Sequence, residues 1–272
     1  MNMKRLFYLL FVLVAYASCN KEELNENIKP SNTMYLVDKV YDYNNNLIAE
    51  YIYDDSNKLI LRKDRDTVHS RSSDYVFIYK KEQLEQIIYL DYDMPQFNHE
   101  IHLEYDASGK IISDFTTKSG KEINNNYYTY DKDNRIVAIY KVTPEKPYYH
   151  FYYDDAGNVR ESVLVMDVSN DPMHGGKDTI QVHRFFRYDK KPKANFSLNN
   201  VFQVEMYPYF GTEATLEKAL SANNMIEFVN ATTWNYRYTE EGLPEEIETK
   251  WKDVTMLSPL IHRITYKEVK AP

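Results

Sequence analysis

Cysteine is almost absent from the sequence, and so are the short motifs that identify common enzymes. The 272 residues include one cysteine, Cys19, and only seven glycines. There is no glycine-rich loop that could cradle a phosphate, no Gly-x-Ser-x-Gly motif and no dinucleotide-binding fingerprint. The sequence therefore gives no sign of a nucleotide-dependent enzyme or a serine hydrolase, and we expect no cofactor and no catalytic residue.

An excess of basic residues is missing as well. The formal net charge is −8 at pH 7. Proteins that bind nucleic acid normally present a basic face to the phosphates. We therefore expect no nucleic-acid partner.

The amino terminus carries the most specific signal in the sequence. Lys4 and Arg5 precede an apolar run of 13 residues, 6–18, which ends in small side chains. A positive start followed by an apolar run too short to span a bilayer predicts a secretory signal peptide over residues 1–18.

The residue behind that run gives the signal peptide its expected consequence. The stretch YASC, residues 16–19, resembles a bacterial lipobox, with Tyr16 standing where Leu is usual. The resemblance implies cleavage before Cys19 and attachment of lipid to it, so that the protein is held at a membrane. A lipidated Cys19 leaves no thiol for a disulfide, a zinc site or a nucleophile. The alternative is an ordinary signal peptide followed by an incidental cysteine.

The residues after the cysteine predict a flexible tether. Residues 19–34 are polar and charged without apolar periodicity, and the KEE at 21–23 resembles the acidic export signals of surface lipoproteins of the Bacteroidetes. We expect an outer-membrane lipoprotein of the bacterial cell envelope, facing the periplasm or the surface, with one folded domain over residues 35–272.

Tyrosine is abundant, with 26 residues, and its positions are periodic. A stretch of the form Tyr-Asp-x-x-Gly/Asn-x-apolar, or a degenerate copy of it, begins at Tyr41, Tyr53, Tyr79, Tyr105, Tyr130, Tyr153, Tyr188 and Tyr238. From Tyr53 to Tyr153 the steps are 26, 26, 25 and 23 residues. Repetition at this period indicates a tandem structural unit rather than a binding motif that recurs.

The unit has the chemistry of a β-hairpin. Asp after the tyrosine can accept backbone hydrogen bonds and start a turn, as Asp154 would after Tyr153. The Gly or Asn four residues after the tyrosine tolerates the positive φ that a type I turn followed by a left-handed residue requires. Two strands per unit predict about 14 to 16 strands, and an antiparallel sheet that large should curl, close or split into layers rather than stay flat. The expected fold is mainly β: a large curled or two-layered antiparallel sheet built from tandem β-hairpins.

One stretch departs from the strand pattern and predicts a short helix near residues 213–222. Thr212 is a suitable N-cap, and Leu216 and Leu220 share one helical face. We expect this helix to pack on the sheet or to plug an open end.

The repeated units resemble the YD repeats of Rhs- and teneurin-type proteins, which form spiralling antiparallel sheets. Together with the lipoprotein start, the SANN at 221–224 and the closing YRYTEEGLPEEI at 236–247, they resemble a group of Bacteroidetes lipoproteins. That group carries a YD-repeat-like domain of unknown function. The resemblance implies a fold and a compartment over residues 35–272, and it implies no catalytic residue.

The nearest approach to a metal site is HEIHLE at residues 99–104. On a strand, Glu100, His102 and Glu104 share one face and could ligate a divalent cation. The other interpretation, a solvated polar face, is favoured, and we expect no metal.

A second candidate is an aromatic stripe near the carboxyl terminus. Trp234, Tyr236 and Tyr238 alternate on one strand, and Trp251 falls on the same side of the return strand. The stripe could stack on sugar rings or form the core face of the sheet, and the core is favoured because large aromatics are usually buried.

These observations lead to a hypothesis of a lipid-anchored envelope protein that is a non-enzymatic binding or scaffolding module, for glycan or a partner protein. The alternative is a carbohydrate-active hydrolase on the same scaffold, which requires two carboxylates flanking a glycosidic bond. A third possibility is a structural or inhibitory surface protein without a small ligand.

Overall fold

The computed structural model describes most of the chain after the predicted tether. The described residues are 33–66, 71–141, 148–168, 179–198, 214–252 and 259–271. The signal peptide, Cys19 and most of the tether lie outside these ranges. By its contacts the chain divides into a small unit, Met1–Met34 with Lys270–Pro272, and a large unit, Tyr35–Val269. No helix among the described residues is long and apolar enough to cross a membrane.

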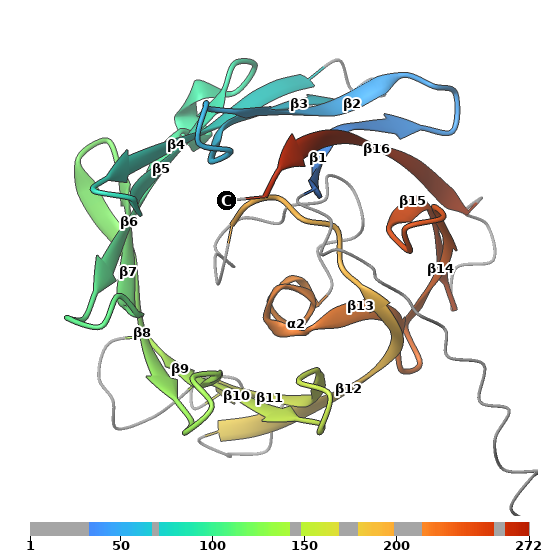
Figure 1. Ribbon diagram of the computed structural model, residues 1–272. Coiled ribbons are helices and arrows are strands. Elements are labelled where there is room, and N and C mark those ends of the chain that lie inside the picture. The colour runs from blue at the N-terminus through green and yellow to red at the C-terminus, as the bar shows by residue number, and fades with distance from the viewer. Residues whose placement is uncertain are drawn as a thin grey trace, which may run out of the picture. The chain divides into compact units, whose positions relative to one another are not determined.

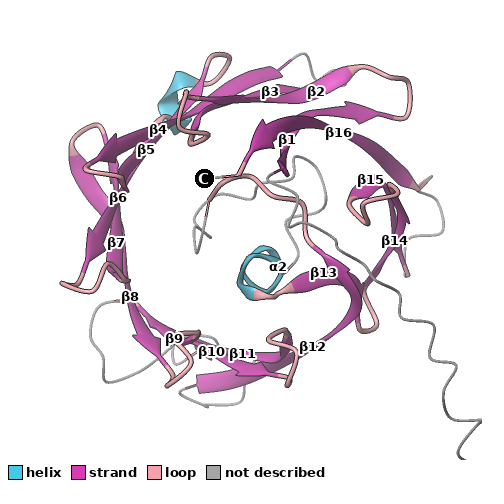
Figure 2. Cartoon of the chain, in the orientation of Figure 1, coloured by secondary structure: helices cyan, strands magenta, loops and turns pink. Residues whose placement is uncertain are grey.

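The large unit is a closed antiparallel β-barrel (Figures 1 and 2). In the described residues sixteen strands follow one another around the barrel in chain order, and β16 closes it against β1. The strands are β1 (Thr33–Asp42), β2 (Leu47–Tyr53), β3 (Leu59–Asp66), β4 (Arg71–Lys80), β5 (Gln83–Asp91), β6 (His99–Tyr105), β7 (Ile111–Lys118), β8 (Lys121–Tyr130), β9 (Ile136–Tyr140), β10 (Tyr149–Tyr153), β11 (Val159–Asp167), β12 (Thr179–Pro192), β13 (Asn223–Phe228), β14 (Thr232–Tyr238), β15 (Pro244–Trp251) and β16 (Leu260–Lys270). A 3-10 turn, η1 (Pro95–Phe97), and the helix α2 (Thr215–Leu220) complete the described elements.

The mainly-β class and the strand number predicted from the repeat are confirmed, but the predicted form of the sheet is wrong. The sheet is neither open and curled nor two-layered, because it closes on itself through β1 and β16. Closure removes the two unpaired edges that an open sheet of this size would expose. The predicted helix near residues 213–222 exists as the shorter α2, which begins after Ala214; Thr212 lies outside the described residues.

The repeated turn has the predicted geometry. At Asp154, for example, the backbone N–H donates to Asn158 O (2.9 Å), Gly157 N–H donates back to Asp154 O (3.1 Å), and Gly157 has φ of 83°. Asp154 Oδ1 also accepts the N–H of Asn158 at 2.8 Å. The register shifts by one residue just before the turn, between Tyr152 and Tyr153. A type I turn with a left-handed residue and a bulge therefore ends the hairpin, as the Asp and Gly chemistry predicts.

The first copy of this turn does not lie at the same end of the barrel as the others. The turn after Tyr41 joins β1 to β2, whereas the turn after Tyr53 joins β2 to β3. Because neighbouring strands are antiparallel, successive turns alternate between the two ends. The turns after Tyr105, Tyr130 and Tyr153 follow even-numbered strands and share an end with the turn after Tyr53.

Eight tyrosine hydroxyls tie this shared end together. Each lies on an even-numbered strand and donates to a backbone carbonyl of the preceding odd-numbered strand, at 2.5–3.0 Å. We call these donors the rim tyrosines: Tyr53 (to Val37), Tyr79 (Leu59), Tyr105 (Leu84), Tyr130 (Ile111), Tyr153 (Ile136), Tyr188 (Val159), Tyr236 (Met225) and Tyr266 (Pro244). At this end of the barrel, turns join β2 to β3 and β4 to β5, whereas tyrosine hydroxyls bond β2 to β1 and β4 to β3.

Burial keeps the hydroxyls of the rim tyrosines protonated. Burial, more than the nearby charges, raises the pKa of Tyr79 and that of Tyr130 to about 12. It raises the pKa of Tyr53, Tyr153 and Tyr188 further. The hydroxyls stay protonated and keep donating at neutral pH, each contributing about 1 kcal/mol net. Six of the eight tyrosines that begin a repeat, all except Tyr41 and Tyr238, are rim tyrosines and so have an architectural role.

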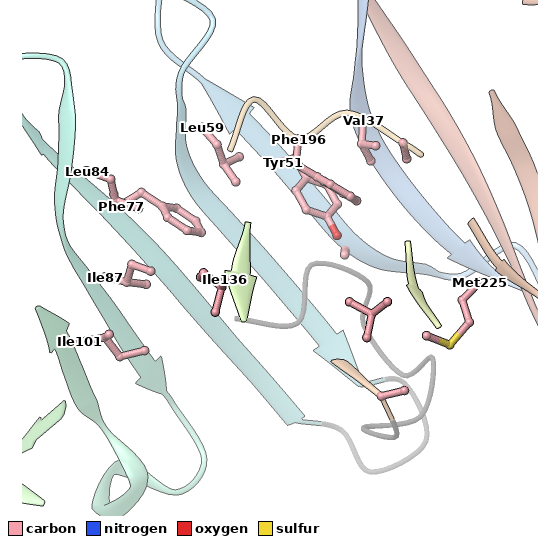
Figure 3. Close-up of a cluster of buried hydrophobic side chains, with 14 of the residues drawn as sticks. Val37, Tyr51, Leu59, Phe77, Leu84, Ile87, Ile101, Ile136, Phe196 and Met225 are labelled. Atoms are coloured by element: carbon pink, nitrogen blue, oxygen red, sulfur yellow. The ribbon is translucent and has the colours of Figure 1, made fainter. Parts of the chain in front are cut away.

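The interior of the barrel is filled mainly by apolar side chains from the inner faces of the strands. Figure 3 shows part of this cluster, including Leu59, Ile87 and Ile136, which are 0–2% exposed. The connection between β12 and β13 also enters the interior, and it carries Phe196 and α2 (Figure 1). The ring of Phe196 lies beside Tyr51 of β2 (Figure 3).

Buried polar contacts fasten α2 to the barrel wall. Glu217 is 1% exposed, and its Oε1 accepts hydrogen bonds from Ser162 (2.5 Å) and from the guanidinium of Arg184 (3.3 Å). The Lys193 ammonium, which lies on the same connection, donates to two carbonyls at the carboxyl end of α2, at 3.0 and 2.9 Å. A positive charge there also favours the helix dipole. Burial lowers the pKa of Lys193 to about 8.

Candidate functional site

Five residues that are neighbours across five adjacent strands form a row on the inner face of the barrel. We call them the inner row: Tyr51 (β2), Arg62 (β3), Tyr75 (β4), Tyr89 (β5) and His99 (β6). Each is the direct register partner of the next, so one side chain from every strand contributes in turn. Cross-strand partners on one face are close enough to interact.

The row is continuous. The Arg62 guanidinium carbon lies 5.9 Å from the ring centroid of Tyr51 and 5.0 Å from that of Tyr75. The Tyr75 and Tyr89 centroids are 4.8 Å apart, and those of Tyr89 and His99 are 5.0 Å apart. These separations match the spacing of strands, about 4.8 Å. A cation between aromatic rings and tilted ring pairs are both attractive arrangements.

Alternation along the strands places the row on the inner face. Tyr75 is two residues from Phe77 and Tyr89 is two residues from Ile87, and both apolar neighbours are at most 3% exposed. The first two members of the row, Tyr51 and Arg62, are also almost fully buried. Tyr75, Tyr89 and His99 are only half-buried, so solvent reaches the row from the β4–β6 side.

Two carboxylates flank the row. Asp64 accepts two hydrogen bonds from the guanidinium of Arg62, both at 2.7 Å. Asp91 accepts two backbone N–H groups of the turn that follows it, at 3.0 and 2.7 Å, and the Tyr89 hydroxyl at 3.4 Å. Ser73 stands between the two carboxylates as the register partner of both. The row therefore offers ring faces bordered by hydrogen-bonding groups.

Arg62 keeps its charge although it is buried. Burial alone would lower the pKa of its guanidinium, but Asp64 and the nearby tyrosines together raise that pKa above its ordinary value. Burial also raises the pKa of Tyr89, so this hydroxyl remains a donor at neutral pH. Arg62 therefore stays charged and Tyr89 stays neutral at neutral pH.

The aromatic stripe predicted from the sequence lies elsewhere on the inner wall. Trp234 is 1% exposed, and the Lys218 ammonium of α2 lies 4.2 Å from its ring centroid. Tyr236 is one of the rim tyrosines, and its ring stacks with that of Tyr238 at 5.9 Å. Tyr238 donates to Asp189.

Trp251, the fourth residue of the stripe, is half-buried and pairs in register with Thr232 of β14. A ligand-stacking role for these four residues stays a prediction.

The weak metal candidates occupy the outer face of β6, since Ile101 and Leu103 between them are buried inside. His102 Nε2 lies 3.3 Å from Glu100 Oε2, which also accepts from Gln86. Glu104 instead accepts the Ser113 hydroxyl, and the His102 ring stacks on Phe115 at 4.6 Å. Within the described ranges no group of three potential ligands comes together here or elsewhere.

Comparison with solved structures finds matches at low sequence identity. A porin-like protein from Bacteroides uniformis ATCC 8492 is 14% identical, with a TM-score of 0.48, over 80% of this chain and 90% of that one. A porin-like protein from Bacteroides vulgatus ATCC 8482 is 18% identical, with a TM-score of 0.39, over 86% of this chain and 99% of that one. The complex TcdB2-TccC3-Cdc42 matches 84% of this chain with 12% of its own chain, at 12% identity and a TM-score of 0.30.

A scan against family models and a search of curated proteins found no match. All three TM-scores are below 0.5, so these similarities do not indicate a function for this chain.

The inner row was missed at the level of the sequence, although its pairing is encoded there. The five-residue turn after Tyr53 and the bulge before it fix Tyr51 opposite Arg62. The same reasoning at the next turn gives Tyr75 opposite Tyr89. The sequence does not say which of these rings remain half-exposed.

Proposed function

We propose that this protein is a lipid-anchored envelope protein that binds glycan on the inner row of its barrel and does not catalyse a reaction. The observation that carries the proposal is the continuous row from Tyr51 to His99, with three ring-bearing members half-exposed on the inner face. Lipid on Cys19, expected from the signal sequence, supplies the anchor at the outer membrane.

The chemistry of the row suits a sugar. Ring faces accept the C–H faces of a pyranose, and flat aromatic side chains lose little conformational freedom on binding. Asp64, Asp91 and Ser73 lie beside the rings; both carboxylates are buried and accept hydrogen bonds from the protein, and they form the polar border of the row. The row runs across the strands, in the direction of the backbone hydrogen bonds, so the centroids of adjacent rings are 4.8–5.0 Å apart.

Calorimetric titration of the purified full-length protein with cello-, malto- and xylo-oligosaccharides tests this function. We expect binding, and a loss of about tenfold in affinity for Tyr89→Ala because a stacking surface is removed. Tyr152→Ala is the matched control, since Tyr152 is 46% exposed on a strand outside the row. Equal affinity of all three proteins would place the ligand elsewhere. No binding by the wild type would favour a structural role or a protein partner.

The anchor has a separate test. Cys19→Ala removes the residue that would carry the lipid, so the variant is expected in the soluble fraction after cell lysis. A variant that stays in the membrane fraction at unchanged yield would contradict the lipoprotein assignment. Ser18→Ala, beside the cleavage position, serves as the control that retains the cysteine.

A hydrolase is the second candidate, and the two carboxylates at the row favour it. Asp64 and Asp91 lie on strands β3 and β5, two strand spacings apart, roughly 10 Å. Inverting glycosidases place their carboxyl groups about 6.5–9.5 Å apart. Both carboxylates already accept hydrogen bonds from the protein, Asp64 from Arg62 and Asp91 from the backbone of the turn that follows it. Release of reducing ends by the wild type, abolished in Asp91→Asn, would establish hydrolysis instead.

A further inference from the structure

The inner row reaches the end of the barrel opposite the rim tyrosines, and another exposed ring lies next to it there. His99, the last member of the row, is the first residue of β6, so it lies where the β5–β6 connection joins the barrel. Phe97 belongs to that connection and is 49% exposed. His99 Nδ1 donates to the Phe97 carbonyl at 2.9 Å, which holds the two residues together. The exposed end of the row therefore continues outward from His99 to Phe97.

The connection that carries Phe97 is held in one conformation by its own hydrogen bonds. Phe97 N–H donates to Met94 O at 2.9 Å within η1, where Pro95 restricts the backbone further. Asn98 Oδ1 accepts the N–H of Asp91 at 2.7 Å, which ties the end of the connection to its start. A ring on such a preordered backbone loses little conformational freedom when a ligand stacks on it.

Two lysines lie beside this ring, at the hairpin that joins β7 to β8. Lys118 and Lys121 are direct register partners on either side of a two-residue turn. Both turn residues, Ser119 and Gly120, have positive φ, 51° and 72°, as a type I′ hairpin turn requires. The Lys118 ammonium lies 5.5 Å from the centroid of the Phe97 ring. The hairpin thus places two positive charges next to an exposed aromatic face.

These two charges are not neutralised by carboxylates. In the part of the chain that the structure describes, neither ammonium forms an ion pair. Glu122, which follows Lys121, is the register partner of Thr117 and therefore lies on the other face of the hairpin. Like charges directly opposite each other on two strands are destabilising. A bound anion would offset that repulsion.

We propose that Phe97, Lys118 and Lys121 form an outer subsite that binds an acidic sugar, one with a carboxylate or sulfate group. The inference rests on the proposed glycan-binding function and extends the same row. The Phe97 ring accepts the C–H face of the sugar, and the ammonium groups bind its anionic group. Neighbouring sugars of the same glycan stack on His99 and Tyr89. The ligand is thus an acidic glycan that enters from the end opposite the rim tyrosines.

Calorimetric titrations of the full-length protein at low and high salt test the outer subsite. The ligands are oligogalacturonates, which carry carboxylates, κ-carrageenan oligosaccharides, which carry sulfates, and neutral malto-oligosaccharides. At low salt the double variant Lys118→Gln/Lys121→Gln should bind the acidic oligomers about three- to tenfold more weakly than the wild type, since exposed charge pairs contribute modestly. High salt should reduce this difference, and the affinity for malto-oligosaccharides should not change.

The barrel offers a matched control at its other end. The ammonium groups of Lys58 and Lys110 lie 5.4 and 5.5 Å from the ring centroids of two rim tyrosines. Lys58→Gln/Lys110→Gln therefore removes the same charge from lysines that also lie over aromatic rings, but far from the outer subsite. This variant should keep the wild-type affinity for acidic oligomers. Phe97→Ala should weaken their binding about fivefold, because the stacking surface is lost.

The outcomes separate the inference from the proposed function. Equal loss of affinity for acidic oligomers in the two double variants would assign the effect to net charge and overturn the outer subsite, while glycan binding stands. Equal affinities of all proteins for every oligomer would do the same. No binding of any oligomer by the wild type would overturn both proposals. If Lys118→Gln/Lys121→Gln abolishes acidic binding that Tyr89→Ala leaves unchanged, the outer subsite stands and the role of the inner row is wrong. A loss confined to one acidic series identifies the group as carboxylate or sulfate.

Discussion

The rim tyrosines make a sharp prediction, because the chain places a matched control next to one of them. Tyr153 donates its hydroxyl to Ile136 O at 2.7 Å, whereas its neighbour Tyr152 is 46% exposed. Tyr153→Phe and Tyr152→Phe delete the same single oxygen atom from adjacent residues. Only the first deletion breaks a bond between two strands.

The expected magnitude follows from that bond. A net loss of about 1 kcal/mol comes from the hydrogen bond, and a carbonyl left without its partner can add up to about 1 kcal/mol more. The Arg135 guanidinium, 4.6 Å from the ring centroid, can still face a phenylalanine, so this contact is retained. Tyr153→Phe should therefore lower the free energy of unfolding by about 1–2 kcal/mol. Tyr152→Phe should change it by less than about 0.5 kcal/mol.

Urea unfolding followed by circular dichroism measures the difference. With an m-value of about 3 kcal/mol/M, the midpoint of Tyr153→Phe should fall by roughly 0.3–0.7 M at unchanged slope. Equal midpoints for the two variants would refute the idea that the rim hydroxyls hold the barrel together. An altered slope for Tyr153→Phe alone would show that the variant changes the surface exposed on unfolding, and not only the free energy of unfolding.

Three further predictions follow from the same barrel. Burial raises the pKa of Tyr79 and that of Tyr130 to about 12, so the unfolded chain loses these protons at a lower pH than the folded chain. The stabilisation should be complete below about pH 10 and should be lost as the pH rises toward 12. In an alkaline titration, phenolate absorbance and loss of ellipticity should appear together. Arg62→Met strands the buried carboxylate of Asp64 and should cost about 3–5 kcal/mol in thermal unfolding, most of which the double variant with Asp64→Leu should restore; no recovery would contradict the pairing. Gly157→Ala should cost about 1–2 kcal/mol in urea unfolding, since its φ is 83° while the added Cβ meets nothing closer than 3.7 Å, whereas Asn134→Gly at φ of 61° should be close to neutral.

Local chemistry explains which parts of the fold could be predicted from the sequence. The turn after Tyr153 was predictable because Asp154 and Gly157 determine it within five residues. The strand number followed from counting such turns. Closure of the sheet was not predictable, because it depends on pairing between β1 and β16, whose residues are more than 200 positions apart. No local pattern marks the last strand as the partner of the first.

The candidate site was predictable only in its ingredients. Aromatic residues on alternating strands were visible, but the sequence directed attention to Trp234, which lies next to Lys218 of α2 and is 1% exposed. Tyr75 and Tyr89 stay half-exposed because no comparable segment covers them in the described part of the chain. The exposure of each aromatic side chain depends on where the β12–β13 connection enters the barrel. The sequence around residues such as Phe196 does not predict where that is.

The strand order has a consequence for how the chain reaches its native state. Every strand pairs with its neighbours in sequence, so a pair of strands can form as soon as its residues are available. The hydroxyl of the rim tyrosine can then bond to the preceding strand and stabilise that pair. Where β16 meets β1, Arg263 donates to Asn45 in the turn after β1, and Thr265 donates to Lys39 of β1; these residues are 218 and 226 positions apart. Loop-closure entropy makes such distant contacts the slowest to form. Assembly should therefore proceed from the first hairpin to the last as the polypeptide emerges, and the ring should shut in a final kinetic step.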